Sequence, residues 1–438
     1  MSLISPRVLK GFRDILPESE LVRRTLTSQL ESAFRRFGYV PIDTPTLEYT
    51  EVLLGKGGGE TDKQVFRFTD HGGRDVSMRF DLTVPFARYM AAHLPELYTP
   101  FRRYHIGKAW RGENTQRGRY REFVQCDFDI VGVDSASADA DTLLTAIEAF
   151  RVLGVDRVRL HVAHRGLLNR FLAELGCADR SEDILRTVDK LRKVGREKTE
   201  ADLGSLVGAD AAGRISEYIT AEGPANEVVD RLETLAGGPA EDTERIRTVL
   251  SALEEAGAGD SVIYDPSITR GLDYYTGLVF ETFLQDLPEI GSVCSGGRYN
   301  DLASLYTKQE LPGVGGSVGL DRLLAALDQL EQGPEAIRAC DVLVFCFDQS
   351  LLGYYHRIAG GLRDAGFSAE VYPEAKKLGQ QFSYAEKKGI PIAVICGPDE
   401  KESGMINCKD LRNRESFEAA GMPEVIKEIS MRLGVQSH

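Results

Sequence analysis

The chain has 438 residues, of which 53 are lysine or arginine and 67 are aspartate or glutamate, so its net charge is −14. A length of this order predicts about three domains, and 42% hydrophobic with 27% charged residues excludes a disordered or fibrous protein. The acidic balance argues against a surface that binds nucleic acid over its whole extent, but it leaves room for a local basic site.

Neither the apolar runs nor the cysteines point to a membrane or secreted protein. The longest apolar runs, at 342–347 and 390–396, are far shorter than the ~20 residues of a membrane span. Residues 1–14 hold no apolar stretch before a cleavage site, so we expect a cytoplasmic protein. The 7 Cys are odd in number and never spaced Cys-x-x-Cys, which predicts reduced, buried thiols. No metal-ligand spacing occurs among the His and Cys residues, so no structural metal is expected.

The first part of the chain alternates helix and strand signals. Apolar residues from Leu21 to Phe34 recur with helical spacing between Pro17 and Gly38, which predicts an amphipathic helix. The proline-containing segment 38–45 is predicted to be an extended strand at an edge or interface. Further strands are predicted at 76–80, 104–110, 123–131 and 158–162.

Residues 166–260 differ in texture and are predicted to form an inserted helical module. They combine helical runs with loops rich in Gly and Ala, and they carry 20 acidic against 12 basic side chains. Strand character resumes at 261–264 and 278–283. Beyond a polar linker at 331–334, strands and helices alternate through 337–438 in the manner of β-α-β units.

Basic residues are concentrated between Arg102 and Arg121. Glu113 is the one acidic residue of this segment, so its local charge is +6 in a chain of −14. A solvated face normally mixes both signs, and arginine suits bidentate contact with phosphate, so we interpret the cluster as a polyanion site. The cluster consists of Arg102, Arg103, Lys108, Arg111, Arg117, Arg119 and Arg121.

The predicted strand 123–131 has two different faces. Period-two alternation places Gln125, Asp127 and Asp129 on one face and apolar residues on the other. The polar row, next to a cationic loop, could bind a cationic group such as an amine or imidazole. A purely structural row of hydrogen-bonded carboxylates is the alternative.

Two further clusters combine glycines with functional side chains. Segment 269–277 brings an arginine, a carboxylate and two tyrosines between glycines. Segment 313–319 is a glycine-rich strand that leads into a predicted helix at 319–329 with Arg322 near its start. Its glycines would allow either close approach to a ligand or helix packing. No P-loop, dinucleotide-binding or HExxH motif occurs.

Together, these segments resemble the histidyl-tRNA synthetase family of class II aminoacyl-tRNA synthetases. The resemblance runs nearly end to end and is weakest in 166–260. Pro45 falls where the first class II motif places a proline at a dimer interface. The other matching segments are Lys10-Gly-Phe-Arg-Asp-Ile-Leu-Pro17, the second-motif segment 111–123, the third-motif segment 319–322, and the histidine-specific segments 270–275 and 295–299.

The resemblance implies an α+β fold: an antiparallel sheet of six strands flanked by helices, an inserted helical domain, and an α/β anticodon-binding domain. The implied domains are a catalytic core in two parts (1–165 and 261–330), the insertion (166–260) and the anticodon-binding domain (337–438). The implied reaction joins histidine and ATP into histidyl-adenylate and then transfers the histidyl group to the 3′ end of histidine tRNA. Mg²⁺ accompanies ATP, and a homodimer without membrane contact is implied.

Residue roles also follow from the resemblance. Asp81, Thr83 and Gln125 would hold the α-amino group of histidine. Asp129 and Tyr275 would read its imidazole. The remaining residues implied to contact histidine are Tyr274, Arg111 and Arg270.

For ATP and tRNA, the implied roles fall mainly on the second and third motifs. Arg111 and Arg270 would be catalytic by clamping the α-phosphate, with Arg322 on the terminal phosphate. Glu113 and Phe123 would seat the adenine. Gln116 and Arg117 would reach the acceptor end of the tRNA.

The chain departs from the family pattern at Asn300 and Asp321, where aspartate and glutamate are common. The insertion has a charge of −8, so its tRNA contact would be confined to the basic run 192–198. Two rival hypotheses are a histidine-sensing subunit of histidine biosynthesis and the pseudo-synthetase module of a starvation-sensing kinase. Both are disfavoured because the three phosphate-binding arginines, Arg111, Arg270 and Arg322, are all present.

Overall fold

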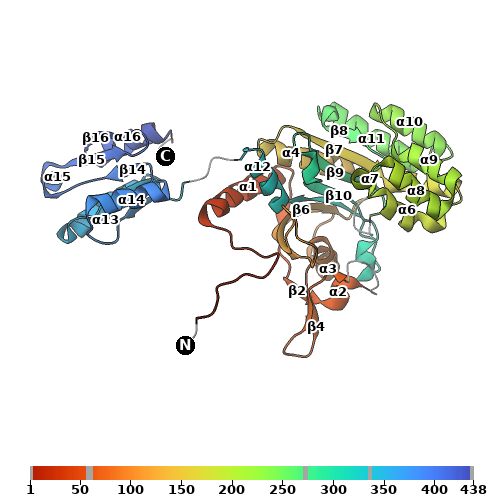
Figure 1. The fold of residues 1–438 in the computed structure, drawn as a ribbon, viewed down its shortest axis with the longest axis horizontal. Coiled ribbons are helices and arrows are strands. Elements are labelled where there is room, and N and C mark those ends of the chain that lie inside the picture. The colour runs from red at the N-terminus through yellow and green to blue at the C-terminus, as the bar shows by residue number, and fades with distance from the viewer. Residues whose placement is uncertain (1–2, 56–62, 270–274, 334–337, 435–438) are drawn as a thin grey trace. The chain divides into compact units, whose positions relative to one another are not determined.

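The computed structural model describes residues 3–55, 63–269, 275–333 and 338–434. The chain divides into two compact units (Figure 1). The first consists of Met1–Leu16 and Arg23–Pro334, and the second of Pro17–Val22 and Glu335–His438.

The first unit is built on a sheet of eight strands in the order β1-β5-β6-β11-β10-β9-β7-β8. The six inner strands pair antiparallel, as the resemblance implies, and β1 and β8 each add a parallel edge strand. Pro41 lies in edge strand β1, where its lack of an N–H group does not interrupt the hydrogen bonds between inner strands. The strands are β1 Val40–Pro41, β5 Phe101–Trp110, β6 Glu122–Val131, β7 Val158–His164, β8 Val262–Tyr264, β9 Leu278–Leu284, β10 Cys294–Arg298 and β11 Gly313–Gly319.

The two faces of this sheet differ as the alternation in β6 predicts. On one face, α1 (Pro17–Arg36) places the Phe34 ring 5.2 Å from the Phe128 ring, and α4 (Ala136–Val152) contacts β6, β7 and β11. On the other face, cross-strand pairing sets Arg103 opposite Asp129. The helices therefore cover the apolar face, and the polar face is left for a site.

A smaller antiparallel sheet, in the order β2-β4-β3, lies in the same unit. Its register puts Tyr49 and Phe68 on either side of Val76. Together with Leu47, Tyr49 and Phe68 form an apolar row in which each residue is 45% to 50% exposed. The strands are β2 Leu47–Tyr49, β3 Arg67–Thr69 and β4 Asp75–Met78, and the adjacent helices are α2 Thr50–Leu54, α3 Thr83–His93 and α12 Leu320–Gln329.

The predicted helical insertion forms the connection between β7 and β8. These strands are parallel neighbours, so the chain must cross over between them, and it does so through helices (Figure 1). Phe171 and Tyr218 stack at 4.4 Å in the interior of this segment. The helices are α5 Arg165–Glu174, α6 Ser181–Val188, α7 Leu191–Val194, α8 Arg196–Val207, α9 Ala209–Ile219, α10 Ala225–Leu235 and α11 Glu241–Glu255.

The second unit has a sheet of five strands in the order β13-β12-β14-β15-β16. β12 pairs in parallel with β13 and β14, as β-α-β alternation predicts, whereas the antiparallel hairpin β15–β16 was not expected. Alternating residues of β12 enter two cores, one with Val342 and Val344 and the other with Leu343. The elements are β12 Val342–Val344, α13 Leu352–Asp364, β13 Ala369–Val371, α14 Leu378–Lys388, β14 Ile392–Val394, α15 Pro398–Ser403, β15 Met405–Asp410, β16 Glu415–Ala420 and α16 Met422–Leu433.

All seven cysteines are free and buried, which confirms the prediction of structural thiols. Within the described ranges, no helix has both the length and the apolar character needed to cross a membrane.

Candidate active site

Two adjoining cavities open on the polar face of the large sheet. The first, which we call the arginine cavity, has a volume of ≈190 Å³ and is lined by Arg111, Glu113, Phe123 and Arg322 among others. The second, the carboxylate cavity, measures ≈280 Å³ and contains Asp129. The two cavities share seven lining residues: Arg111, Arg119, Gln125, Ser292, Ser295, Ser317 and Arg322.

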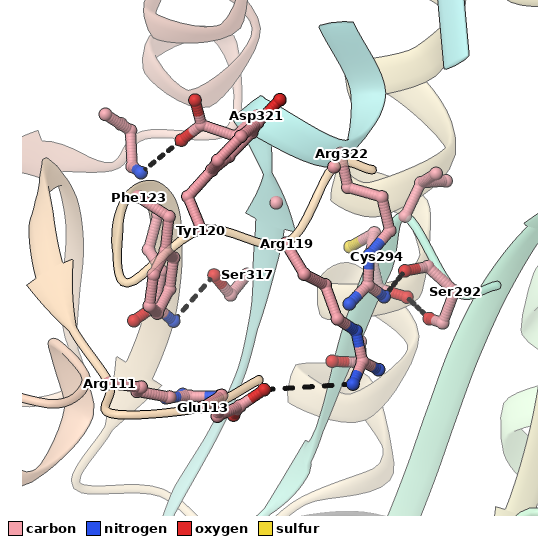
Figure 2. A pocket seen from close by; sticks show the side chains of 16 residues that line it. Arg111, Glu113, Arg119, Tyr120, Phe123, Ser292, Cys294, Ser317, Asp321 and Arg322 are labelled. Carbon is pink, nitrogen blue, oxygen red and sulfur yellow. Dashed lines mark hydrogen bonds and ion pairs between the residues drawn. The ribbon is translucent and has the colours of Figure 1, made fainter. Parts of the chain in front are cut away.

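The arginine cavity is lined by three guanidinium groups, those of Arg111, Arg119 and Arg322, and by the carboxylates of Glu113 and Asp321 (Figure 2). Arg111 and Arg119 each lie 3.8 Å from Glu113, so neither ion pair is tight. Arg322 donates a hydrogen bond to the carbonyl of Ser292. This excess of positive charge suits a chain of phosphates.

An aromatic ring completes the arginine cavity. The Arg111 guanidinium lies 5.1 Å from the centre of the Phe123 ring, and its Nε donates to the Phe80 carbonyl at 2.9 Å. Arg111 is therefore held by backbone and ring contacts, and it stands where the two cavities meet. The four residues predicted to bind ATP all line this cavity, although their roles remain predictions.

The carboxylate cavity collects Thr83, Gln125, Asp129 and Tyr275, which were predicted from the sequence to bind histidine. Gln125 Nε2 donates to Ser317 Oγ at 3.1 Å. Burial raises the pKa of Asp129 to about 7, against the opposing charge of Arg103. A carboxylate in such a site pairs well with a ligand N–H group.

Tyr299 belongs to this cavity but was not assigned a role from the sequence. Its hydroxyl donates a short hydrogen bond to Asp129 Oδ1. Tyr299 is the last residue of the histidine-specific segment 295–299, so this motif could have identified it. Ser292 and Glu281, which also line the cavity, stand in no motif that would have identified them.

Asp81, predicted to hold the α-amino group of histidine, lies near Asp129 and Arg111 but behind the cavity walls. It is fully buried and does not line either cavity as formed by the described residues. Its Oδ1 accepts from the Val84 N–H at 3.1 Å, at the start of α3. Burial raises its pKa to about 6. Arg270 and Tyr274, also predicted here, lie outside the described residues.

The interpretation of all seven basic residues as one polyanion site is wrong. Arg103 is fully buried, with Nη2 2.7 Å from Asp129, and Arg102 pairs with Asp141 at 2.5 Å. Adjacent residues of a strand point to opposite faces, and here each arginine meets a carboxylate of its own face. Of the cluster, Arg111 and Arg119 line the cavities.

Gln116 and Arg117, predicted to contact tRNA, lie in the exposed loop between β5 and β6. Backbone hydrogen bonds in both directions between Gln116 and Arg119 close this loop. Arg117 Nη2 lies 3.1 Å from Asp328. The loop thus presents Arg119 to the cavity while Gln116 and Arg117 stay at the surface.

The two departures from the family pattern occupy supporting positions. Asp321 accepts from the Val124 N–H at 2.6 Å and also pairs with Arg13, which ties α12 to the start of β6. Asn300 accepts from Arg298 at 3.2 Å and donates to Asp134 at 2.9 Å.

The sequence left open whether the glycines of β11 allow close approach to a ligand or helix packing, and the structure shows a third use. Gly315 and Gly316 line the carboxylate cavity. A Cβ at Gly316 would lie 2.7 Å from the Phe280 ring and 2.8 Å from the Phe128 ring, and one at Gly315 would collide with Asp129. Side chains of neighbouring strands therefore use the space that these glycines leave.

Comparison with known proteins agrees with this geometry. The family model for histidyl-tRNA synthetase matches residues 11–323, and that for an anticodon-binding domain matches 341–432. The histidine–tRNA ligase of Treponema denticola is 49% identical over 443 residues, covering 98% of each chain, and that of Rhodopirellula baltica is 48% identical over 427 residues, covering 95% of this chain and 96% of its own. The crystal structure of histidyl-tRNA synthetase from a Nostoc species superposes with a TM-score of 0.87 at 30% identity, covering 98% of this chain and 100% of its own. The chain is therefore a member of the histidyl-tRNA synthetase family, within the class II aminoacyl-tRNA synthetases.

Proposed function

We propose that the chain activates histidine with ATP in the two joined cavities and then transfers the histidyl group to the 3′ end of histidine tRNA. The observation that carries this proposal is the arrangement of a cavity with three arginines next to a cavity with a buried carboxylate. Arg111 and Gln125 line both, so two substrates bound side by side would meet at these residues.

Histidine would occupy the carboxylate cavity. Its imidazole would donate to Asp129 and contact Tyr275, and its α-amino group would face Thr83 and Gln125. A side chain that cannot pair with the buried Asp129 would leave that carboxylate unsatisfied, which costs binding energy and gives specificity. Asp81 remains a proposed partner of the α-amino group. Arg270 and Tyr274 remain proposed contacts of the bound histidine.

ATP would occupy the arginine cavity with its base near Phe123 and Glu113 and its terminal phosphate at Arg322. The carboxylate of histidine attacks the α-phosphorus, and the bond to pyrophosphate breaks. Both reacting groups, the histidine carboxylate and the α-phosphate, are anionic, so Arg111 would lower the barrier by placing positive charge where negative charge accumulates. Arg270 is the second residue proposed for this role.

Mg²⁺ would enter with ATP and neutralise charge on the phosphates. Among the described residues, no three His, Cys, Asp or Glu side chains converge on one point, and Glu113 and Glu281 are acidic residues on the cavity walls. This donor set fits an ion held mainly by phosphate oxygens with one or two protein carboxylates.

For tRNA, we propose that Gln116 and Arg117 contact the acceptor end and that the unit at 337–438 binds the anticodon. We also retain the domain limits 1–165, 166–260, 261–330 and 337–438 as a proposal.

We further propose a cytoplasmic homodimer. The exposed apolar row consists of Leu47, Tyr49 and Phe68, and its first two members come shortly after Pro45, where the first class II motif would form the dimer interface. Burying such a row against a second copy would remove apolar surface from water. Tyr49→Glu should shift the protein from dimer to monomer in analytical ultracentrifugation, and an unchanged dimer would assign the interface elsewhere.

The function is tested by histidine-dependent ATP–pyrophosphate exchange, followed by charging of tRNA with a histidine anticodon. Exchange with histidine but not with other amino acids is expected. Binding of histidine without any exchange at saturating ATP and Mg²⁺ would instead support the histidine-sensing hypothesis.

A further inference from the structure

Arg103 is a fully buried arginine at the base of the candidate site. Its Nη2 lies 2.7 Å from Asp129 Oδ2 and 3.7 Å from Asp127 Oδ2, and its guanidinium lies 4.2 Å from the centre of the Phe86 ring. None of its three guanidinium nitrogens makes a hydrogen bond with any described residue. Its contact with Asp129 is therefore ionic, without hydrogen-bond geometry.

Such an arrangement is costly for stability alone. Removing a guanidinium group from water is costly, and a buried ion pair recovers this cost only with good hydrogen bonds; apolar residues of similar size are often as stable. Arg103 lacks those bonds. A role beyond packing is therefore the simpler explanation for an arginine at this position.

The two oxygens of Asp129 are used differently. Oδ1 accepts the hydrogen bond of the Tyr299 hydroxyl, whereas Oδ2 faces Arg103 and accepts no hydrogen bond within the described part of the chain. Oδ2 is thus held by charge while its capacity to accept a ligand N–H remains available. Asp129 itself lines the carboxylate cavity.

Apart from Arg103, most of the surroundings of Asp129 favour its protonated form. Burial raises its pKa, and Asp127 and Asp81 raise it further. His105, next on the same face of β5, adds no charge because burial and Arg103 lower its pKa to about 3. The titratable and charged groups that face Asp129 are Arg103, Asp127, Asp81, Tyr275 and Tyr299.

We propose that Arg103 is a positioning residue for histidine recognition, which holds the Asp129 carboxylate ionised and oriented so that it can accept the imidazole N–H. This inference rests on the proposed function. It assigns to Arg103 an effect on histidine binding and not on ATP binding or on the chemical step, because Arg103 lines neither the arginine cavity nor the boundary that the two cavities share.

The test compares Arg103→Met with the charge-conserving Arg103→Lys. Histidine affinity is measured calorimetrically from pH 6.5 to 9 as a ratio to the parent protein, which cancels the titration of histidine itself. The Met variant should bind histidine ~5-fold more weakly at pH 7, because a rise of about one unit in the pKa of Asp129 would lower its ionised fraction there from about a half to roughly a tenth. By pH 9 the ratio should approach one.

The exchange assay adds a second readout. For Arg103→Met, the KM for histidine should rise, while the KM for ATP and kcat at saturating histidine stay within about threefold of the parent. The Lys variant should recover most of the affinity. An affinity ratio that is flat with pH, or an equal loss in the ATP parameters, would overturn the inference.

If Arg103→Met does not melt cooperatively, the neutral polar variant Arg103→Gln decides the question. Loss of the guanidinium charge should move the pH midpoint of histidine binding upward. An unmoved midpoint would reject the role of Arg103. Absence of histidine binding by the parent protein would reject the proposed function together with this inference, whereas normal parental binding with flat ratios rejects the inference alone.

Discussion

Two segments of the chain concentrate basic residues, and the fold treats them differently. The loop after β5 directs Arg111 and Arg119 into the arginine cavity, where Glu113 lies 3.8 Å from each. In the helical segment between β7 and β8, the basic run at 192–198 is matched with local partners. Arg192 lies 2.6 Å from Asp265, and Lys198 lies 2.7 Å from Asp202.

The difference shows what makes an anion site. Arg192 also lies 4.0 Å from the centre of the Phe283 ring, so its guanidinium is already used by the fold. In the arginine cavity, one carboxylate serves two arginines at long range, and a phosphate could take its place. Whether a basic segment can bind an anion therefore depends on how many carboxylates lie within reach of its side chains in the folded chain. The density of positive charge in the sequence does not decide it.

The largest effect expected from this comparison is that of Arg111→Ala. Loss of a guanidinium group placed between the two cavities should lower the rate of ATP–pyrophosphate exchange by ~100-fold or more. Arg102→Ala is the matched control, because Arg102 belongs to the same cluster but pairs with Asp141 away from the cavities. Equal losses in both variants would mean that the whole cluster acts together.

The next effect is a pH dependence of histidine binding. Because the pKa of Asp129 is raised to about 7, its carboxylate is ionised above that pH and protonated below it. Histidine affinity, corrected for the titration of free histidine, should therefore fall by up to about tenfold for each pH unit below 7. Asp129→Asn should bind weakly at pH 8 and lose this dependence; a persistent dependence would point to another group.

A smaller effect is expected for the surface of the loop. Arg117→Ala should reduce the slope of log kcat/KM for tRNA against log salt concentration by about 1, because one phosphate contact is lost. Lys198→Ala in the helical segment should leave that slope unchanged. The reverse result would place the tRNA on the basic run at 192–198.

The smallest effect on activity is expected for Arg192→Ala. Burial raises the pKa of Asp265, but hydrogen bonds from His161 and Ser267 and the charge of Arg192 outweigh burial and lower this pKa to about 2. Loss of Arg192 should cost ~1 kcal/mol in urea unfolding and leave the exchange rate unchanged. A stable variant with slow exchange would connect this segment to catalysis.

Much of the site could be predicted from local patterns. Alternation in β6 separated Gln125 and Asp129 from the apolar face, and the motifs located Glu113, Phe123 and Arg322, all of which line the cavities. The burial of Arg103 could not be foreseen, because it depends on cross-strand register between β5 and β6, which no local period specifies.

The fold shows the same limit. Long elements with strong periods, such as α1 and β6, were predicted close to their observed bounds. Strands at 38–45 and 261–264 were predicted where β1 and β8 lie, but their parallel pairing was not, since it is decided by partners distant in the sequence. The hairpin β15–β16 was not predicted either. The backbone carbonyl of Ser292 accepts a hydrogen bond from Arg322. Every residue type has such a carbonyl, so the sequence could not identify this contact.

The contacts of the N-terminal segment bear on the order of folding. Arg13 reaches across 308 positions to Asp321 and lies 3.7 Å from the centre of the Tyr120 ring, while the Gly11 carbonyl accepts from the Arg121 N–H at 2.8 Å. These contacts fasten the loop that lines the arginine cavity. Contacts of such long sequence separation form slowly because a large loop must close first. The arginine cavity, the proposed nucleotide site, should thus mature only after the start of the chain, the β5–β6 loop and α12 have come together. A nascent chain should therefore not consume ATP before nearly all of the catalytic unit has been made.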